Sequence, residues 1–445
     1  MNCKKSTLYF VCLVMLLASA CKKDNNSASG GTTADDLAKD SAWMYAQDIY
    51  LWYKTLPRSF NPRSYSDPNA IMEAIRAYSI EPGFTDPVDR WSFGIKKAEW
   101  DNVSSGISGD FGLGIFFNST NDLRVSYVEP ASPAGAAGIT RSWRITSVNN
   151  DTTINTDDAT ITRISTAVFS SSSTSFVFKR PDNTDTAITL TAATYQEQPI
   201  LLDSVYTIGG NKIGYFVYNS FLGNVTTIKS KFSTLFSKFS SAGITDMVID
   251  LRYNGGGYVE LQNELANYLV PAAGNGGVML QEKFNDKLSA TEDTTINYSK
   301  KGSLNLSRLF FITTKNTASA SELLINSLKP YVDVKLIGKP SHGKPVGFFN
   351  IGVGDWYIFP VSFRSVNKNG EGNYFNGLQP DANVSDGLDK QWGDVQENCL
   401  ASALHYITNG AFSRLSAKTQ DDSKTESGNT KLDVRRFKGA VRSRK

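Results

Sequence analysis

Two residue types that build metal centres and covalent cross-links are scarce in this chain. Its 445 residues include four cysteines and two histidines. Cys3 and Cys12 lie in the first segment of the chain, so only Cys21 and Cys399 remain beyond it. A disulfide framework needs several paired cysteines, and a zinc site needs three or four suitable ligands. The sequence therefore predicts neither a disulfide framework nor a metal centre built from cysteine or histidine.

An excess of one charge is also missing. The chain has 46 Lys and Arg against 43 Asp and Glu, a net charge of +3. This is too small to indicate a nucleic-acid partner. Much of the excess lies at the C-terminal end, and the sequence predicts that residues 413–445 form a polar, basic, disordered tail.

Only one apolar run stands out, at residues 8–17, and it is too short to span a bilayer. Basic residues precede it, as in a secretory signal, and "ASAC" follows, ending at Cys21. This segment resembles a bacterial lipoprotein signal, although Ala18 stands where such signals usually carry Leu. The resemblance implies that Cys21 is lipidated and that residues 22–40 are a flexible tether. A lipid would hold the protein on a membrane of the bacterial cell envelope, which we expect to be the outer membrane, facing the periplasm or the cell surface. An ordinary cleavage site before a cysteine is the alternative.

In the rest of the chain, the composition and the spacing of apolar residues change twice, near residues 106 and 196. This predicts a multidomain α/β protein. Residues 41–105 carry apolar residues at helical spacing after a candidate N-cap, Ser41, and predict a small helical N-terminal domain. Residues 106–195 alternate short β-rich runs with Gly, Asn and Ser, and predict a β-rich domain. Residues 196–412 alternate strands and helices, the βαβ order of an α/β domain with a largely parallel sheet. Near its end, residues 355–367 predict a pair of antiparallel strands.

The β-rich segment contains two motifs that resemble those of a PDZ domain. These are "FGLGIFF" at 111–117 and "VEPASPAGAAGI" at 128–139. Glycines let backbone N–H groups converge on a carboxylate. The resemblance implies that the C-terminus of a peptide is bound by four consecutive residues, Gly112, Leu113, Gly114 and Ile115.

A stretch around residue 344, "IGKPSHGKPVGF" at 337–348, allows three interpretations. A phosphate-binding P-loop needs Ser or Thr after the lysine and a following helix, but Pro345 follows here and the next residues are β-like. The S-x-x-K spacing of Ser341 and Lys344 would need a helical turn, which Gly343 and Pro345 disfavour. In the third interpretation, Lys344 is a lone catalytic amine whose serine lies elsewhere. A Ser-His-Asp triad stays open as well, through His342 or His405.

A candidate serine lies upstream, in "TTKNTASASELLINS" at 313–327. This string follows a predicted buried strand and opens a predicted helix. The first N–H groups of a helix have no partners within it, so they are ready donors for an oxyanion.

Together these motifs resemble the C-terminal processing (tail-specific) serine peptidase family, over roughly residues 41–405. The motifs are "TASASELLINSLK" and "GKPSHGKPVG", with "IDLRYNGGG" before them and "GLQPD" after them. The resemblance implies a Ser–Lys dyad of Ser319 and Lys344, with an oxyanion hole formed by the N–H groups of Gly255 or Gly256 and of Ala320. It also implies an α/β catalytic core with crotonase-like βαβ units, polypeptide substrates with free C-termini, and no cofactor.

Two positions depart from that family pattern. Phe348 stands where the family often has a Gln that orients the lysine, and Pro330 stands where some members have Asp. Asp333 is near Pro330 in the sequence. These departures leave a second hypothesis, a catalytically impaired, peptide-binding scaffold lipoprotein.

Overall fold

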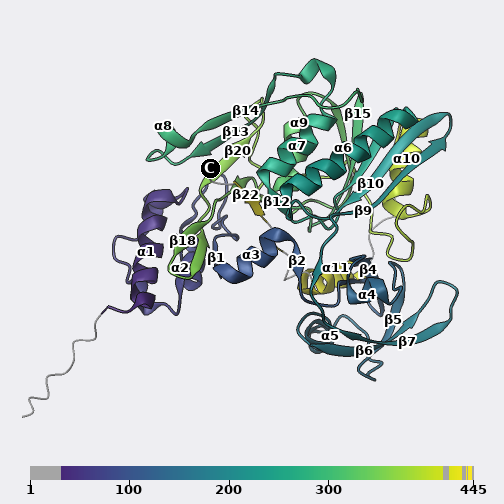
Figure 1. Ribbon diagram of the computed structural model, residues 1–445, viewed down its shortest axis with the longest axis horizontal. Coiled ribbons are helices and arrows are strands. Elements are labelled where there is room, and N and C mark those ends of the chain that lie inside the picture. Colours follow the sequence, from purple (N-terminus) through teal and green to yellow (C-terminus); the bar gives the residue numbers. More distant parts are fainter. Residues whose placement is uncertain (1–31, 414–419, 433–436, 438, 443–445) are drawn as a thin grey trace, which may run out of the picture.

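The computed structural model describes residues 32–413, 420–432, 437 and 439–442. Figure 1 shows a unit built around α1 on the left, a large core, and a smaller lobe below that core. The predicted signal and Cys21 lie outside the described residues. Within the described ranges, no helix combines the length and the apolar character needed to cross a bilayer.

The first helix starts earlier than the sequence predicts. It is α1 (Ala34–Ile49), and Thr33 caps it: the Asp36 amide donates to the Thr33 hydroxyl, and the Asp36 carboxylate accepts from the Thr33 amide, both at 3.0 Å. This reciprocal pair satisfies two donors at the N-terminus. The predicted start at Ser41 is therefore wrong, and the segment predicted as a tether up to residue 40 is already helical from Ala34.

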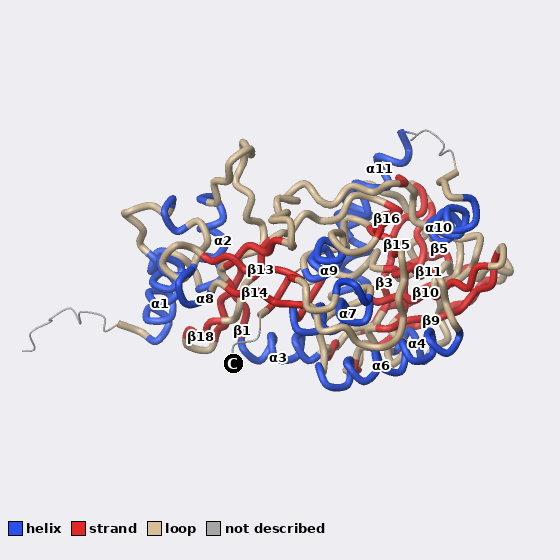
Figure 2. The backbone as a smooth tube through the Cα atoms, turned by 90° about the horizontal axis from the view of Figure 1, so that it is seen from above, coloured by secondary structure: helices blue, strands red, loops and turns tan. Residues whose placement is uncertain are grey.

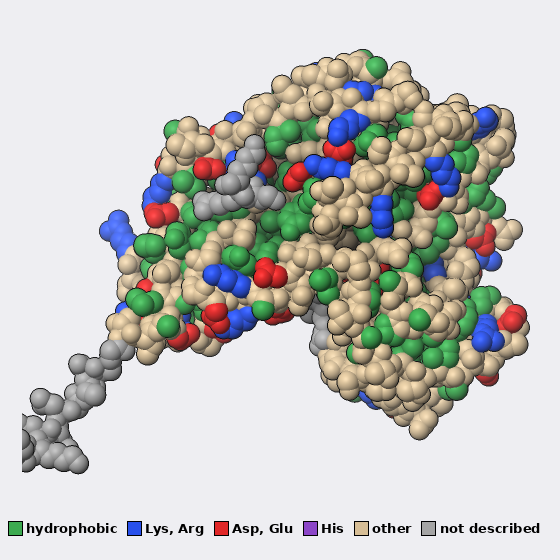
Figure 3. Space-filling view, in the orientation of Figure 1, with side chains coloured by type: hydrophobic (Ala, Val, Ile, Leu, Met, Phe, Trp, Pro, Cys, Tyr) green, Lys and Arg blue, Asp and Glu red, His purple; other side chains and the backbone are tan. Residues whose placement is uncertain are grey.

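The N-terminal unit is not a purely helical domain. After α2 (Pro68–Ile75), β1 (Phe93–Lys96) pairs antiparallel with β19 (Trp356–Phe359), which in turn pairs with β18 (Ile351–Val353). The predicted helices are present, but the prediction that this domain is helical throughout is wrong, because β1 belongs to it and its aromatic residues share one core with residues from the far end of the chain. Hydrophobic side chains gather in the middle of the face in Figure 3, where this unit meets the rest of the molecule. The remaining helices of this unit are the short η1 (Tyr53–Thr55), η2 (Pro62–Ser64) and η3 (Arg76–Tyr78), and then α3 (Lys97–Ser105).

The smaller lobe is a five-stranded antiparallel sheet in the order β3-β4-β5-β6-β7. Its strands lie where the sequence predicts β-rich runs, and β3 is an edge strand of this sheet. The identity of the lobe as a PDZ domain stays a prediction. Its elements are β3 (Leu113–Ser119), β4 (Asp122–Val128), α4 (Pro133–Ala136), β5 (Arg144–Val148), α5 (Asp158–Phe169), β6 (Ser173–Lys179) and β7 (Asp185–Thr191), and the short pair β2 (Ile107–Ser108) and β8 (Tyr195–Gln196) joins it to the core.

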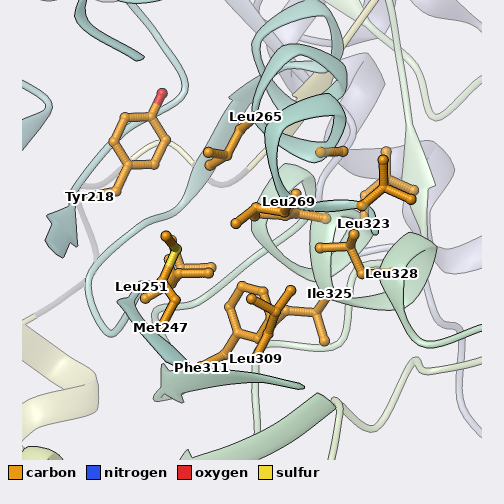
Figure 4. Packing of buried hydrophobic residues seen from close by; sticks show 14 of the residues in the cluster. Tyr218, Met247, Leu251, Leu265, Leu269, Leu309, Phe311, Leu323, Ile325 and Leu328 are labelled. Atoms are coloured by element: carbon orange, nitrogen blue, oxygen red, sulfur yellow. The ribbon is translucent and has the colours of Figure 1, made fainter. Parts of the chain in front are cut away.

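The core contains a six-stranded sheet in the order β21-β16-β15-β11-β10-β9. From β10 to β21 all neighbours are parallel, and only β9 is antiparallel, which confirms the predicted α/β core. Leucines of α7 and α9 pack against Met247, Leu309 and Phe311 of the sheet (Figure 4). On its other face the sheet packs against α10. The elements are β9 (Ile200–Ile208), β10 (Asn211–Tyr218), α6 (Val225–Ala242), β11 (Asp246–Asp250), α7 (Val259–Leu269), β15 (Arg308–Thr313), α9 (Ala320–Leu328), β16 (Asp333–Gly338), β21 (Ala382–Asn383) and α10 (Asn398–Asn409).

A further four-stranded sheet, in the order β14-β13-β20-β17, lies between the core and the N-terminal unit (Figure 2). The predicted antiparallel pair within residues 355–367 is wrong, because β19 and β20 belong to different sheets. Pro360 lies between them and lacks the N–H group that a sheet ladder needs. The elements are η4 (Ala272–Gly274), β13 (Val278–Phe284), α8 (Ser289–Glu292), β14 (Thr294–Asn297), β17 (Val346–Gly347) and β20 (Phe363–Val366).

The C-terminal segment is ordered in two places, so the prediction of a disordered tail is wrong there. Helix α11 (Gln420–Leu432) lies against the smaller lobe, and β22 (Gly439–Val441) pairs in parallel with β12 (Gly256–Tyr258) of the core. Leu432, Ala440 and Val441 are buried. Polar and charged residues dominate the composition of residues 413–445, so the sequence gives little indication that these few apolar residues are buried.

Candidate active site

Ser319 lies on the turn between β15 and α9, as the sequence predicts, in an unusual backbone conformation. Its φ is 56° and its ψ is −106°, which a residue with a side chain rarely adopts. The side chain is buried, and its Oγ has no hydrogen-bond partner among the described residues. Backbone strain of this kind concentrates at functional sites.

A buried carboxylate connects this turn to the segment of Lys344. Glu322 Oε2 accepts from the Ser319 amide at 2.7 Å and from the Lys344 amide at 2.9 Å. Its Oε1 accepts from Ser341 Oγ at 2.5 Å and from the Gly343 amide at 2.6 Å. One fully buried side chain therefore joins two loops that lie 25 residues apart in the sequence.

Sequence analysis missed Glu322, although a signal was present. Ser or Thr followed three residues later by Glu, just before an apolar run, is a pattern of helix N-termini. Ser319 and Glu322 have this spacing, and α9 begins between them. Burial raises the pKa of Glu322, and the hydrogen bonds it accepts oppose that rise.

Lys344 is also buried, at 1% exposure, in the loop between β16 and β17. Burial holds the pKa of its amine well below the usual value, while the nearby carboxylates of Asp89 and Glu322 act in the opposite direction. Its Nζ lies 3.8 Å from the centre of the Phe348 ring and 5.6 Å from that of Trp91. Phe348, which departs from the family pattern at this position, thus covers the amine of Lys344.

The glycine loop after β11 lies directly beside the serine turn. The Asn254 carbonyl accepts from the Ala318 amide and from Ser321 Oγ, each at 3.0 Å. Gly256 has φ 101°, and a Cβ there would lie 3.0 Å from the Ala320 amide nitrogen. The structure therefore brings Gly255, Gly256 and Ala320 together, as predicted.

One of these predicted oxyanion donors is already engaged. The Gly256 amide donates to Asn254 Oδ1 at 2.9 Å. Asn254 in turn donates from Nδ2 to the Tyr218 carbonyl at 3.0 Å, which fixes its orientation. Of the two glycine amides predicted as alternatives, that of Gly256 is therefore occupied in this conformation, because the loop uses it to hold its own shape.

A cavity of about 640 Å³ connects the glycine loop to the smaller lobe. Its lining includes the four predicted peptide-binding residues at 112–115 together with Gly255 and Gly256. Gly112 has φ 69°, and a Cβ there would lie 2.0 Å from the Ser132 side chain, so the loop requires glycine. The lobe and the loop thus face one continuous space.

Asp333 and His342, two further residues to which the sequence points, make other contacts in the structure. Asp333 begins β16, whose opposite end leads towards Lys344, and it is exposed and paired with Lys335. It does not replace the missing Asp at position 330. His342 Nε2 accepts a hydrogen bond from Trp91 Nε1 at 3.0 Å. In the described part of the chain, no group of three His, Cys, Asp or Glu residues could hold a metal ion.

A buried charge network fixes the smaller lobe to the glycine loop. Arg141, from the lobe, contacts Asp386 at 2.6 Å, and Arg252, three residues before Gly255, contacts the same carboxylate at 2.5 Å. Arg252 also pairs with Asp250 and Glu397 at 2.7 Å and 2.9 Å. Arg141, Arg252, Asp250 and Glu397 are buried, so removal of one partner would leave a buried charge unpaired.

Two family models and several curated proteins match this chain. The model of peptidase family S41 matches residues 212–384, and the model of the peptidase S41 N-terminal domain matches residues 39–93. A protein of Staphylococcus epidermidis described as "Probable CtpA-like serine protease" is 24% identical over 338 residues, 75% of this chain and 64% of its own length. A protein of the same description from Staphylococcus aureus is 26% identical over 266 residues, 58% of this chain and 49% of its own length. The chain thus spans less than two thirds of these curated relatives.

Among solved structures, an S41 protease from Bacteroides fragilis has the same fold. It matches with a TM-score of 0.68 at 22% identity, over 83% of this chain and 97% of its own. The two family models together cover about half of the chain, including the serine turn, the Lys344 loop and the glycine loop. The protein therefore belongs to peptidase family S41.

Proposed function

We propose that this protein is a lipid-anchored serine endopeptidase that cleaves polypeptides near their C-termini by a Ser319–Lys344 dyad. The observation that carries the proposal is the shared contact of Glu322 Oε2 with the amides of both residues. This contact holds an unpaired, buried hydroxyl and a buried amine on adjoining loops. Such a pair is the minimum for nucleophilic catalysis without histidine.

In the proposed mechanism, the neutral amine of Lys344 takes the proton from Ser319 Oγ. A lysine can act as a base only when its pKa is depressed, and burial acts in that direction here. Ser319 Oγ then attacks the peptide carbonyl, and the ammonium of Lys344 returns the proton to the leaving amine. Water hydrolyses the acyl-enzyme by the same proton path.

The developing oxyanion needs donors that are not already used. Since the Gly256 amide donates to Asn254, we assign this role to the amides of Gly255 and Ala320. Gly255 precedes Gly256 in the glycine loop. The Ala320 amide nitrogen, on the serine turn, would lie 3.0 Å from a Cβ on Gly256. We further propose that the predicted loop 112–115 acts as the carboxylate loop of a PDZ domain and captures the substrate C-terminus at the other side of the cavity. The Gly112 amide donates to Asp110 Oδ1 at 2.7 Å, so we assign the binding to the amides of residues 113–115.

The test is hydrolysis of one peptide in two forms, with a free or an amidated C-terminus. We expect cleavage of the free acid, none by Ser319→Ala, and a KM at least several-fold higher for the amide, since a charge-assisted set of hydrogen bonds is worth more than about 1.4 kcal/mol. No turnover by the unsubstituted chain, with retained peptide binding, would favour a peptide-binding scaffold instead. Equal KM values would contradict capture of the carboxylate.

The lipid anchor is a separate expectation, based on the sequence around Cys21. A bacterial strain expressing Cys21→Ala should release the protein from the membrane fraction. After metabolic labelling with a fatty acid, the unsubstituted protein should carry the label and the variant should not. An equally labelled variant would rule out Cys21 as the attachment point.

A further inference from the structure

The C-terminal segment contacts both ends of the cavity that joins the smaller lobe to the glycine loop. Leu432, the last residue of α11, and Phe437 line this cavity together with Leu113, Ile115 and Gly256. In Figure 1 α11, in yellow, lies beside the smaller lobe, and β22 lies next to β12 near the middle of the molecule. The described residues of this segment therefore lie at the same cavity as the predicted peptide-binding residues.

At the smaller lobe, α11 satisfies the open edge of β3. Asn429 Oδ1 accepts from the Phe117 amide at 2.6 Å, and Asn429 Nδ2 donates to the Phe117 carbonyl at 2.9 Å. A side-chain amide thus makes the pair of bonds that an added strand would make. Ion pairs of Lys431 with Asp158 and of Lys315 with Glu426 hold the same helix.

At the catalytic side, β22 is hydrogen-bonded on both of its edges. The Gly439 amide donates to the Gly255 carbonyl at 3.0 Å, in register with β12. On the other edge, the Phe348 amide donates to the Ala440 carbonyl at 3.1 Å, and the Arg442 amide donates to the Phe348 carbonyl at 3.0 Å. A tripeptide strand is therefore held between the glycine loop and the residue that covers Lys344.

The Gly439 carbonyl of this strand lies next to Gly256, the glycine that also adjoins the Ala320 amide. A Cβ on Gly256 would lie 2.4 Å from the Gly439 carbonyl oxygen and 3.0 Å from the Ala320 amide nitrogen. Both groups thus adjoin the same glycine. β22 therefore lies close to the Ala320 amide, to which the proposed function assigns a role as oxyanion donor.

An anchor on the four-stranded sheet completes the contact. Arg442 lies 3.6 Å from Glu282 and 3.3 Å from Glu292. Both carboxylate oxygens of Glu282 are buried and have no hydrogen-bond partner among the described residues. Among the described residues, Arg442 is therefore an ion-pair partner of this buried carboxylate.

We propose that the C-terminal segment of this chain, α11 and β22, is an internal peptide ligand that occupies the substrate path and competes with substrate. The proposal rests on the proposed function for its effect on activity, but the occupancy itself does not. A tethered ligand acts at a high effective concentration, so it lowers the apparent affinity for any peptide added in solution. When β22 is displaced, the substrate path is open to an added peptide. When α11 leaves the smaller lobe, the backbone groups at the edge of β3 are free to pair with a peptide.

Two release variants of the full chain test this. Val441→Asp places a charge at a buried position of β22, and Asn429→Ala removes both bonds to Phe117. Lys424→Ala, an exposed position on the same helix, is the matched control. Each variant is made in a Ser319→Ala background, and binding of a fluorescein-labelled peptide with the sequence of residues 437–442 is measured. We expect at least about tenfold tighter binding by both release variants and no change in Lys424→Ala.

The same release variants with Ser319 intact should show a kcat/KM at least about tenfold higher, mainly through a lower KM. Equal peptide affinity of the release variants and the unsubstituted chain would overturn the proposal. So would a loss of both binding and activity at an unchanged melting temperature, because β22 would then be part of the catalytic framework. If binding tightens but no variant hydrolyses peptide, the internal ligand stands and the proposed peptidase activity falls.

Discussion

Lys344→Arg is expected to lose peptidase activity by at least about 100-fold, as severely as Ser319→Ala. Loss of general-base assistance alone is worth about 10² to 10⁴ in rate. Guanidinium keeps its proton near neutral pH, so arginine retains the charge but cannot act as the base. The measurement is kcat for each variant on one peptide, with the melting temperature as a control for folding.

Because Lys344 is buried, the larger arginine could disturb packing, and Lys344→Met provides a neutral side chain of similar length. It should be equally inactive and at least as stable. His342→Ala should retain most activity, since the mechanism gives that histidine no proton-transfer step. An inactive His342→Ala beside an active Lys344→Arg would replace the dyad with a histidine-based mechanism.

The peptidase rate of the unsubstituted protein should depend on pH in the direction expected for Lys344 as the base. Burial lowers the pKa of Lys344, so the neutral, basic form predominates above that lowered pKa. The rate should therefore rise with pH on its acid side. Lys344→Met should lose this rise together with its activity.

Glu322→Gln is expected to destabilise the fold and to misalign the dyad. The carboxylate accepts four hydrogen bonds, two on each oxygen. An amide can accept on only one of its two terminal atoms, so two buried donors lose their partner. At about 1 to 3 kcal/mol for each unsatisfied group, the free energy of unfolding should fall by about 2 to 6 kcal/mol.

Activity should fall as well, in kcat rather than in KM. Glu322 positions Ser319 and Lys344 through their amides, while the residues that line the peptide path keep their contacts. Urea unfolding and steady-state kinetics should be compared with Glu73→Gln, an exposed position on α2. A variant with normal stability and normal kcat would show that Glu322 does not hold the two loops together.

Sequence patterns predicted those parts of the structure that depend on local periodicity. The parallel strands and helices from β10 to β16 and the strands of the smaller lobe fall on predicted segments. The serine turn and the Lys344 loop are also brought together as expected, because each follows a strand of the same parallel sheet. Here the local pattern and the chain order contain enough information.

Long-range pairing was not visible in the same way. Nothing local in "GAV" at 439–441 indicates that it pairs with β12, and nothing in residues 93–96 indicates a partner beyond residue 350. Glu322 could have been recognised as a capping residue, but not as a bond to residues 343 and 344, because that needs the loop geometry. The engaged amide of Gly256 likewise depends on the position of one side chain, Asn254.

The three-stranded sheet of β1, β19 and β18 has a consequence for how the molecule is made. Its first strand leaves the ribosome early, but the partner at residues 356–359 follows only after the Lys344 loop has been synthesised. Closing so long a loop costs entropy before the pairing contributes, and folds rich in such distant contacts form slowly. The aromatic residues of the N-terminal unit therefore stay exposed during most of translation, because the later residues that pack against them have not yet been synthesised. A nascent chain of this protein should thus depend on protection from aggregation until its last third has been added.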